Sequence, residues 1–259
     1  MNSKSNAARV KKLREKILRA AFEAKDGHIP SSLSVIDILY VIYVLLPREE
    51  EIDFQAEDFF VLSKGHAALA LYAILEEIGF QTDQWISNFG KFESQFGGHP
   101  DSKKLYGVTA STGSLGHGLP FTLGKIFAKR SLGISCNAYC LVGDGEINEG
   151  TTWESLLIAS HHEMNELTLL VDDNGSTNRS LKLGDLENKF KSFGFEVYTV
   201  DGHSHSEILS ALRVRNSKPK AIIASTIKGH GVSAMENNPA WHHAIPDTNQ
   251  LAEMLQNLK

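Results

Sequence analysis

The chain alternates between apolar residues at helical spacing and short, continuous apolar runs. Near the start, Val10, Leu13 and Ile17 recur three or four positions apart, as on the buried face of a helix. Ser34 and Asp247 are predicted N-caps, because short polar side chains accept hydrogen bonds from the first helical turn. Helices are expected over residues 6–25, 34–46, 64–78, 82–89, 115–131, 149–163, 184–193, 205–216 and 247–258.

The continuous apolar runs predict strands over residues 59–62, 138–142, 167–171, 195–200 and 221–226. They lack clean alternation and are separated by helices, which is typical of a parallel sheet covered on both faces. No linker rich in proline, glycine or serine divides the chain. We therefore expect one α/β domain over residues 1–259, with helices on both faces of a parallel sheet.

Composition limits the classes of partner. The net charge of −5 gives no electrostatic reason to expect nucleic acid. The longest apolar run, residues 35–46, is shorter than the roughly 18 residues of a membrane span, so a buried helix is expected and no membrane. Cys136 and Cys140 are predicted to be small core residues rather than a metal pair, which favours a reducing, cytoplasmic compartment.

Polar side chains gather where the predicted strands end, the edge of a parallel sheet where ligands bind. Asp144 ends one strand and Asn174 follows the next, and neighbouring strands lie about 5 Å apart, so the two side chains are expected to meet. Their oxygens suit Mg²⁺, with Ca²⁺ or Mn²⁺ as alternatives. Such an ion would let the acidic loop hold a phosphate, while Gly143 and Gly145 allow close approach of the backbone. Glu146, in the same loop, is expected to be solvated.

Histidines form a second pattern. The chain has 11 histidines, and many stand beside glycine or in predicted loops. Neutral imidazole donates and accepts hydrogen bonds, so a cleft that contacts hydroxyl groups and transfers protons is expected. Neither zinc-binding spacing nor a G-x-S-x-G turn is present. The histidines in question are His28, His66, His99, His117, His203, His230, His242 and His243.

The segments "GDGEINEGTTWES" and "LTLLVDDNGS" resemble the thiamine-diphosphate motif, in which a G-D-G turn is followed about thirty residues later by asparagine. Four further segments narrow the resemblance to transketolases: "DGHIPSSLSVIDILYVIY", "LSKGHAALALYAILEEIG", "STGSLGHGLPFTLGKIFA" and "IKGHGVSAMENNPAWHHAIP". "FGGHPD" is similar to another histidine motif of that family. The resemblance runs from about residue 9 to the end.

The resemblance implies a thiamine-diphosphate-binding fold of the diphosphate (PP) type and a role for each matching residue. Asp144, Asn174 and the carbonyl of Ser176 would hold the metal. His66, Gly143, Gly145 and His243 would contact the diphosphate or substrate, and Gly113 and Leu115 the aminopyrimidine. Glu149 would couple two cofactor sites across a dimer, and His28, His99 and His243 would serve catalysis by contacting the sugar and its covalent intermediate.

The resemblance also implies a partner. Full-length transketolases carry a pyrimidine-binding domain, with the glutamate that activates the cofactor, and a third domain, and neither is expected in these 259 residues. The chain is therefore interpreted as the N-terminal subunit of a split transketolase, active only in an α2β2 heterotetramer. It would transfer a two-carbon ketol unit from a ketose, as a sugar or sugar phosphate, to an aldose.

Two alternatives stay open. One is a thiamine-dependent ketol or acyl transferase with a non-sugar acceptor, and the other a non-catalytic subunit that binds cofactor or supports its partner. The segment after Asn174, "GSTNRSLKLGD", departs from the family pattern of an apolar residue followed by an acid and glycine. There Arg179 is expected to face a substrate or partner. The set of histidine motifs disfavours the α-subunit of a 2-oxoacid dehydrogenase.

Overall fold

The computed structural model describes residues 3–259 and contains a five-stranded sheet in the order β1-β2-β3-β5-β4. The strands are β1 (Phe59–Leu62), β2 (Ala138–Gly143), β3 (Leu167–Asp173), β4 (Glu196–Asp201) and β5 (Lys220–Ser225). All neighbouring strands are parallel, so their carboxyl ends share one edge. The predicted α/β class is confirmed.

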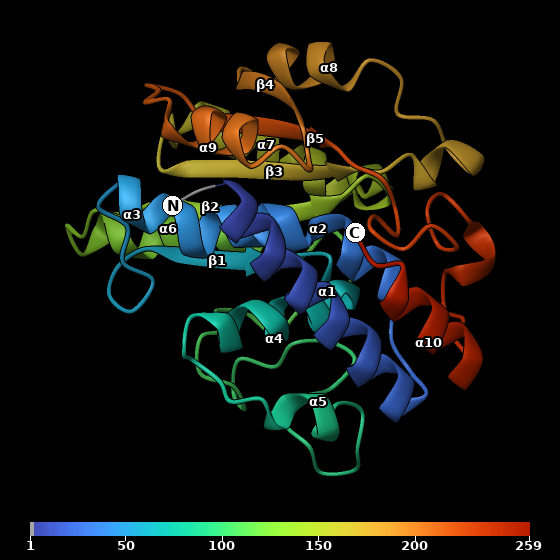
Figure 1. Ribbon diagram of the computed structural model, residues 1–259. Coiled ribbons are helices and arrows are strands. Elements are labelled where there is room, and N and C mark those ends of the chain that lie inside the picture. The colour runs from blue at the N-terminus through green and yellow to red at the C-terminus, as the bar shows by residue number, and fades with distance from the viewer. Residues whose placement is uncertain (1–2) are drawn as a thin grey trace.

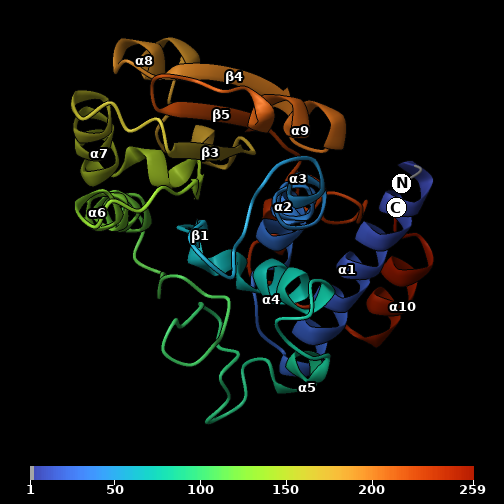
Figure 2. The ribbon, with the colours of Figure 1, turned by 90° about the vertical axis from the view of Figure 1, so that its left-hand side faces the viewer.

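Helices cover both faces of the sheet (Figures 1 and 2). Successive strand residues point to opposite faces: Tyr139 and Leu141 join one apolar cluster, Cys140 and Val142 the other. The first cluster involves α1 (Ser3–Ala24), α2 (Ile29–Tyr40), α4 (Ala68–Glu77), α9 (His205–Arg213) and α10 (Thr248–Gln256). The second involves α6 (Gly118–Ser131), α7 (Gly150–His161) and α8 (Leu186–Ser192).

The most apolar helix lies inside the protein. α2 continues through a π-helical turn (Val41–Leu45) into α3 (Leu46–Glu49). The stretch Ile29–Glu49 is long and apolar enough to cross a membrane, but 94% of its most apolar window is buried against the rest of the chain. The predicted N-cap at Ser34 is wrong, because the helix begins at Ile29 with Pro30 in its first turn, where proline's missing N–H is tolerated.

Several helices begin later than predicted. α4 begins after a 3₁₀ turn (Gly65–Ala67) rather than at residue 64, and α6 begins at Gly118 rather than 115. The residues left out of these helices lie in the loops at the carboxyl edge of the sheet. α5 (Gln84–Asn88) is short, whereas α10 begins at the predicted cap Asp247, which forms a capping box with Gln250. Cys136 and Cys140 are both free thiols, and only Cys140 is fully buried.

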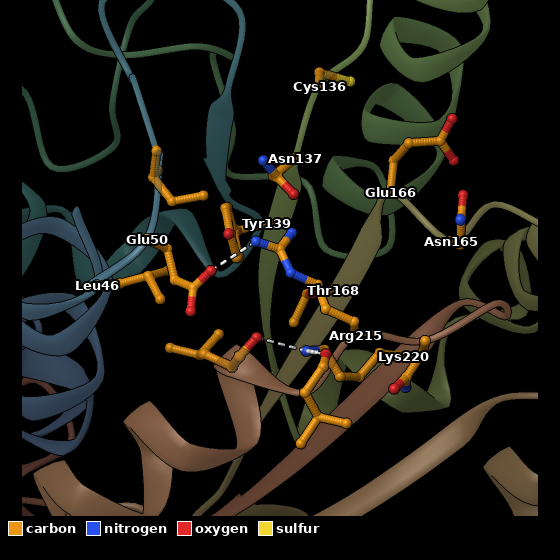
Figure 3. A pocket seen from close by; sticks show the side chains of 14 residues that line it. Leu46, Glu50, Cys136, Asn137, Tyr139, Asn165, Glu166, Thr168, Arg215 and Lys220 are labelled. Atoms are coloured by element: carbon orange, nitrogen blue, oxygen red, sulfur yellow. Dashed lines mark hydrogen bonds and ion pairs between the residues drawn. The ribbon is translucent and has the colours of Figure 1, made fainter. Parts of the chain in front are cut away.

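A buried lysine, Lys220, lies at the opposite, amino edge of the sheet (Figure 3). Lys220 Nζ donates hydrogen bonds to the carbonyls of Ala211, Leu212 and Val214, 2.7–3.0 Å away, and so satisfies the last turn of α9. Burial, together with the nearby Arg215 charge, lowers the pKa of Lys220 to about 8. The cavity here, of about 180 Å³, is lined by this lysine and an Arg215–Glu50 ion pair 2.6 Å long.

Candidate active site

The ends of β2 and β3 meet at Asp144. Its Oδ1 accepts a hydrogen bond from the Gly145 N–H (2.7 Å) and its Oδ2 one from the Thr177 N–H (3.1 Å). One residue before Thr177, the Ser176 N–H donates to Asn174 Oδ1 over 3.1 Å. The structure thus joins Asp144 to the backbone of Thr177, three residues after Asn174, and so brings the two strand ends together.

Asp144 is buried, with 3% of its surface exposed, yet it has no ion pair among the described residues. A buried carboxylate without a cation is costly in free energy. Carboxylate, amide and carbonyl oxygens are the donors that a hard divalent cation prefers. The charge of Asp144 contributes, after burial, to raising the pKa of the neighbouring Asp173 carboxyl. These residues fit a divalent ion, whose positive charge would compensate the acids.

Beneath Asn174 lies a fully buried carboxylate, Asp172. Its Oδ2 accepts hydrogen bonds from Ser34 Oγ (2.9 Å) and Asn174 Nδ2 (2.8 Å) and pairs with the Lys64 ammonium. Burial opposes ionisation of Asp172, but the Lys64 charge together with the hydrogen bonds from Lys64, Thr226 and Ser34 outweighs it and holds the pKa of this carboxyl below its usual range. Because Asp172 binds the Nδ2 of Asn174, the Oδ1 is left on the side of Ser176. Neither Asp172 nor Lys64 was predicted from the sequence, although each adjoins a recognised strand end.

Three of the predicted histidines gather around a fourth, His28, at the start of α2. The ring centroid of His28 lies 4.6 Å from that of His243, 5.5 Å from His242 and 5.4 Å from His66. Burial and the two nearby C-terminal histidines lower the pKa of His28 to about 4. Burial and the Lys64 charge also hold the pKa of His66 well below its usual range. Near neutral pH both rings are uncharged and can donate and accept hydrogen bonds.

The loop that contains Gly113 and Leu115 packs on His99. Gly113 has φ +155°, and a Cβ there would lie 3.0 Å from His99 Cδ2, so glycine permits this contact. Leu115 is half-buried in the same loop. Tyr72 Oη donates to the His99 carbonyl over 3.2 Å and fixes the backbone at this position. His99 also contributes to lowering the pKa of His28.

The two glutamates of the G-D-G segment differ sharply in environment. Glu149, at the N-cap of α7, is exposed, whereas Glu146 has 1% of its surface exposed. The expectation that Glu146 is solvated is wrong, because its carboxylate accepts hydrogen bonds from Ser63 Oγ and from the backbone N–H groups of Gly116 and Gly143.

Lys228 is a further site residue to which no role was assigned from the sequence, and it lies beside the predicted His242. Lys228 Nζ donates to Ser176 Oγ over 3.0 Å and lies 3.2 Å from His242 Nδ1. Burial and the Lys64 charge lower the pKa of Lys228. With Asn174, Ser176 and Arg179 these side chains line a cavity of about 440 Å³. The signal was available in the sequence, since Lys228 occupies a strand end in "IKGHG".

His203 and His230 lie apart from this group, against Asp37 of α2. His203 Nδ1 lies 2.9 Å from Asp37 Oδ2, and its Nε2 accepts a hydrogen bond from the Ile227 N–H over 2.9 Å. The rings of His203 and His230 are stacked 3.6 Å apart, 20° from parallel. In-plane lone pairs of stacked rings do not converge on one ion, and the neutral His203 ring needs its Nδ1 proton for Asp37. This group of three potential ligands is therefore structural, and it fixes the residue before Lys228.

Comparison with known families agrees with this geometry. The family model described as "Transketolase, thiamine diphosphate binding domain" matches residues 5–258. The chain belongs to the transketolase family. The predicted family and the thiamine-diphosphate-binding type of domain are confirmed.

Two curated relatives are single subunits of an enzyme named apulose-4-phosphate transketolase. The one from Actinobacillus succinogenes is 33% identical to this chain, over 97% of the chain and 95% of the relative. The one from Phocaeicola vulgatus is 32% identical, over 95% of the chain and 90% of the relative. Both relatives have a length similar to that of this chain, which confirms the resemblance to the N-terminal subunit of a split transketolase.

Among solved structures, the transketolase of Campylobacter jejuni superposes with a TM-score of 0.88 at 27% identity, covering 99% of this chain and 43% of that one. Human transketolase is 33% identical over 95% of this chain and 41% of its own length. The chain thus spans about two fifths of these full-length transketolases.

Proposed function

We propose that this chain is the diphosphate-binding subunit of a two-component transketolase. The observation that carries the proposal is the buried Asp144 carboxylate, which forms no ion pair within the described part of the chain and is joined through Thr177 to the turn of Asn174 and Ser176. Asp144, Asn174 and the Ser176 carbonyl would hold a divalent ion, with Mg²⁺ as the expected ion, and its charge would compensate the diphosphate. Gly143 and Gly145 allow the diphosphate to approach the backbone.

Cations and neutral histidines suit the remainder of the site. Lys228, next to Ser176, would neutralise diphosphate oxygens together with the ion. Bound thiamine diphosphate would supply addition to a ketose carbonyl and storage of the electron pair released when the carbon–carbon bond breaks. His28, His66, His99 and His243 would bind the sugar hydroxyls and the diphosphate, exchange protons with the reacting oxygen and exclude water.

The substrate class follows from the histidines and the family. The neutral imidazoles of His28 and His66 match a polyhydroxylated, uncharged carbon chain better than an apolar one. We assign this chain the transfer of a two-carbon ketol unit from a ketose, phosphorylated in the simplest case, to an aldose. The names of the two relatives, which refer to apulose 4-phosphate, support a phosphorylated sugar.

The partner is a C-terminal transketolase subunit that supplies the activating glutamate, in an α2β2 assembly in the cytoplasm. Support comes from the neighbouring helices α6 and α7, which expose Phe121 (47%), Leu157 (59%) and Ile158 (44%). Where exposed apolar side chains of neighbouring helices form a continuous patch, a partner chain is the expected cover. Glu149 is exposed at the start of α7, where a second chain would cover it. The two free thiols suit a reducing compartment.

Cofactor binding is testable through tryptophan fluorescence. Thiamine diphosphate with Mg²⁺ should quench the emission of the chain, and Asp144→Ala should abolish this quenching. Asp201→Ala, at the end of β4, is the control and should bind as the wild type does. Equal binding by Asp144→Ala and wild type would refute the metal assignment.

The enzymatic part needs the second subunit. Ketol transfer from a ketose phosphate to an aldose phosphate should require both chains and should be absent with either alone. Transfer by this chain alone would refute the two-component proposal, and a cofactor-loaded but inactive pair would favour a non-catalytic subunit.

A further inference from the structure

The G-D-G segment contains a carboxylate that the proposed function does not use. Glu146 is buried two residues beyond Asp144. Its Oε1 accepts a hydrogen bond from the Gly116 N–H over 2.8 Å, and its Oε2 accepts one from the Gly143 N–H over 3.3 Å. One side chain thus joins the end of β2 to the loop before α6.

A serine extends this connection to the helix itself. Ser63 Oγ donates to Glu146 Oε1 and accepts a hydrogen bond from the Gly118 N–H over 3.1 Å. Gly118 is the first residue of α6, whose initial N–H groups have no partner within the helix. Any Cβ at residue 118 would lie 2.3 Å from Ser63 Oγ, so only glycine lets the hydroxyl approach.

The other side of the loop is held by α7. Thr151 Oγ1 donates to the Gly116 carbonyl over 2.8 Å, so both the N–H and the carbonyl of Gly116 are hydrogen-bonded. Gly116 has φ +79°, in the left-handed region, and a Cβ there would lie 2.7 Å from Glu149 Cβ. The position of Gly116, directly after Leu115, is therefore set from two sides by the G-D-G segment and the helix that follows it.

We infer that Glu146 is a positioning residue, which acts through Ser63 and Gly116 to hold Leu115 and Gly113 where they contact the aminopyrimidine end of the cofactor. This inference rests on the proposed function. Under this inference the two buried acids of the G-D-G segment act on different ends of the cofactor. Asp144 serves the diphosphate end of the cofactor through the ion, and Glu146 serves the other end through the backbone of a loop.

These separate roles predict that substituting Glu146 changes the affinities for two ligands differently. Thiamine diphosphate needs both ends of the site, whereas inorganic pyrophosphate with Mg²⁺ needs only the diphosphate end. In Glu146→Ala the Kd of thiamine diphosphate should rise at least tenfold, while the Kd of Mg²⁺-pyrophosphate should stay within about twofold. Ser63→Ala should act in the same direction but less, because the Gly116 contact remains. Glu146→Gln, which keeps an acceptor for Gly116, should be intermediate.

Calorimetry on the full chain measures both constants, with circular dichroism to verify folding. Glu166→Gln is the matched control, since this half-buried glutamate pairs with Arg130 (2.7 Å) at the amino end of β3 and should leave both constants unchanged. An unchanged Kd for thiamine diphosphate in Glu146→Ala, or equal losses for both ligands, would overturn the inference. A wild-type chain that binds neither ligand would instead overturn the proposed function.

Discussion

The buried pair of Lys64 and Asp172 should be among the most sensitive points of the fold. Their side chains are 1% and 0% exposed, so neither charge has access to water. Lys64→Met keeps the length of the apolar stem and removes the cation. It would leave Asp172 as a buried carboxylate whose remaining partners are neutral donors, among them Ser34 and Asn174.

The expected magnitude follows from this burial. Removing one partner of a buried ion pair costs about 3–5 kcal/mol, because the remaining charge is uncompensated. The free energy of unfolding in urea should fall by that amount, and Tm by roughly 6–20 °C for a chain of this size. The comparison variant is Lys191→Met, whose pair with Glu187 is exposed (51% and 45%) and should change stability by less than about 1 kcal/mol.

A double variant separates lost charge from lost packing. Lys64→Met with Asp172→Asn leaves no buried charge, so it should recover part of the loss of the single variant. Measurements should be made with EDTA, so that a bound ion does not replace the missing lysine. If Lys64→Met loses no more than Lys191→Met, or if the double variant is as unstable as the single one, the electrostatic reasoning is wrong.

Three further predictions concern the site. Burial and nearby histidines lower the pKa of His28 to about 4, and an NMR titration of the folded chain should show this value. Because an unfolded histidine titrates near 6.5, protonation favours the unfolded chain, and the free energy of unfolding should fall as the pH drops from 6.5 to 4. A measured pKa near 6.5 would contradict this. Gly116→Ala should cost about 1–3 kcal/mol in urea unfolding, because φ is +79° and the methyl would meet Thr151 Oγ1 at 2.5 Å, whereas Gly124→Ala, in the open, should be neutral or stabilising. Lys228→Met should weaken Mg²⁺-pyrophosphate binding about tenfold or more in calorimetry, with the exposed Lys218→Met unaffected; equal affinities would remove Lys228 from the site.

Much of the fold follows from local sequence rules. Continuous apolar runs without alternation predicted all five strands of the sheet, because both faces of a parallel sheet are buried. The cap at Asp247 was predictable, since it depends on residues one turn apart. Ser34 was not, because its hydroxyl is satisfied by Asp172, a residue 138 positions away that local rules do not consider.

The same limit applies to the site. Asp144 and Asn174 were predictable because adjacent parallel strands bring their ends together regardless of detail. Lys228 required knowledge that β5, rather than β4, lies beside β3, and this strand order is a tertiary property. The prediction that the histidines beside glycine form one group was wrong for two of them. His203 lies against Asp37 and stacks on His230, and only the adjacent glycines in the sequence had indicated that these two belong to the cleft.

The acidic character of "GDGEINEG" has three separate physical consequences rather than one. A buried carboxylate that forms no ion pair within the described part of the chain, as at Asp144, is stabilised further when an ion binds, so cation binding and diphosphate binding should be coupled. A buried carboxylate that accepts hydrogen bonds from N–H and O–H donors, as at Glu146, is held by these donors and fixes the backbone around it. An exposed carboxylate, as at Glu149, is free to respond to a second chain. Substituting the three one at a time should therefore separate ion dependence, loop position and binding of the partner chain into three distinguishable measurements.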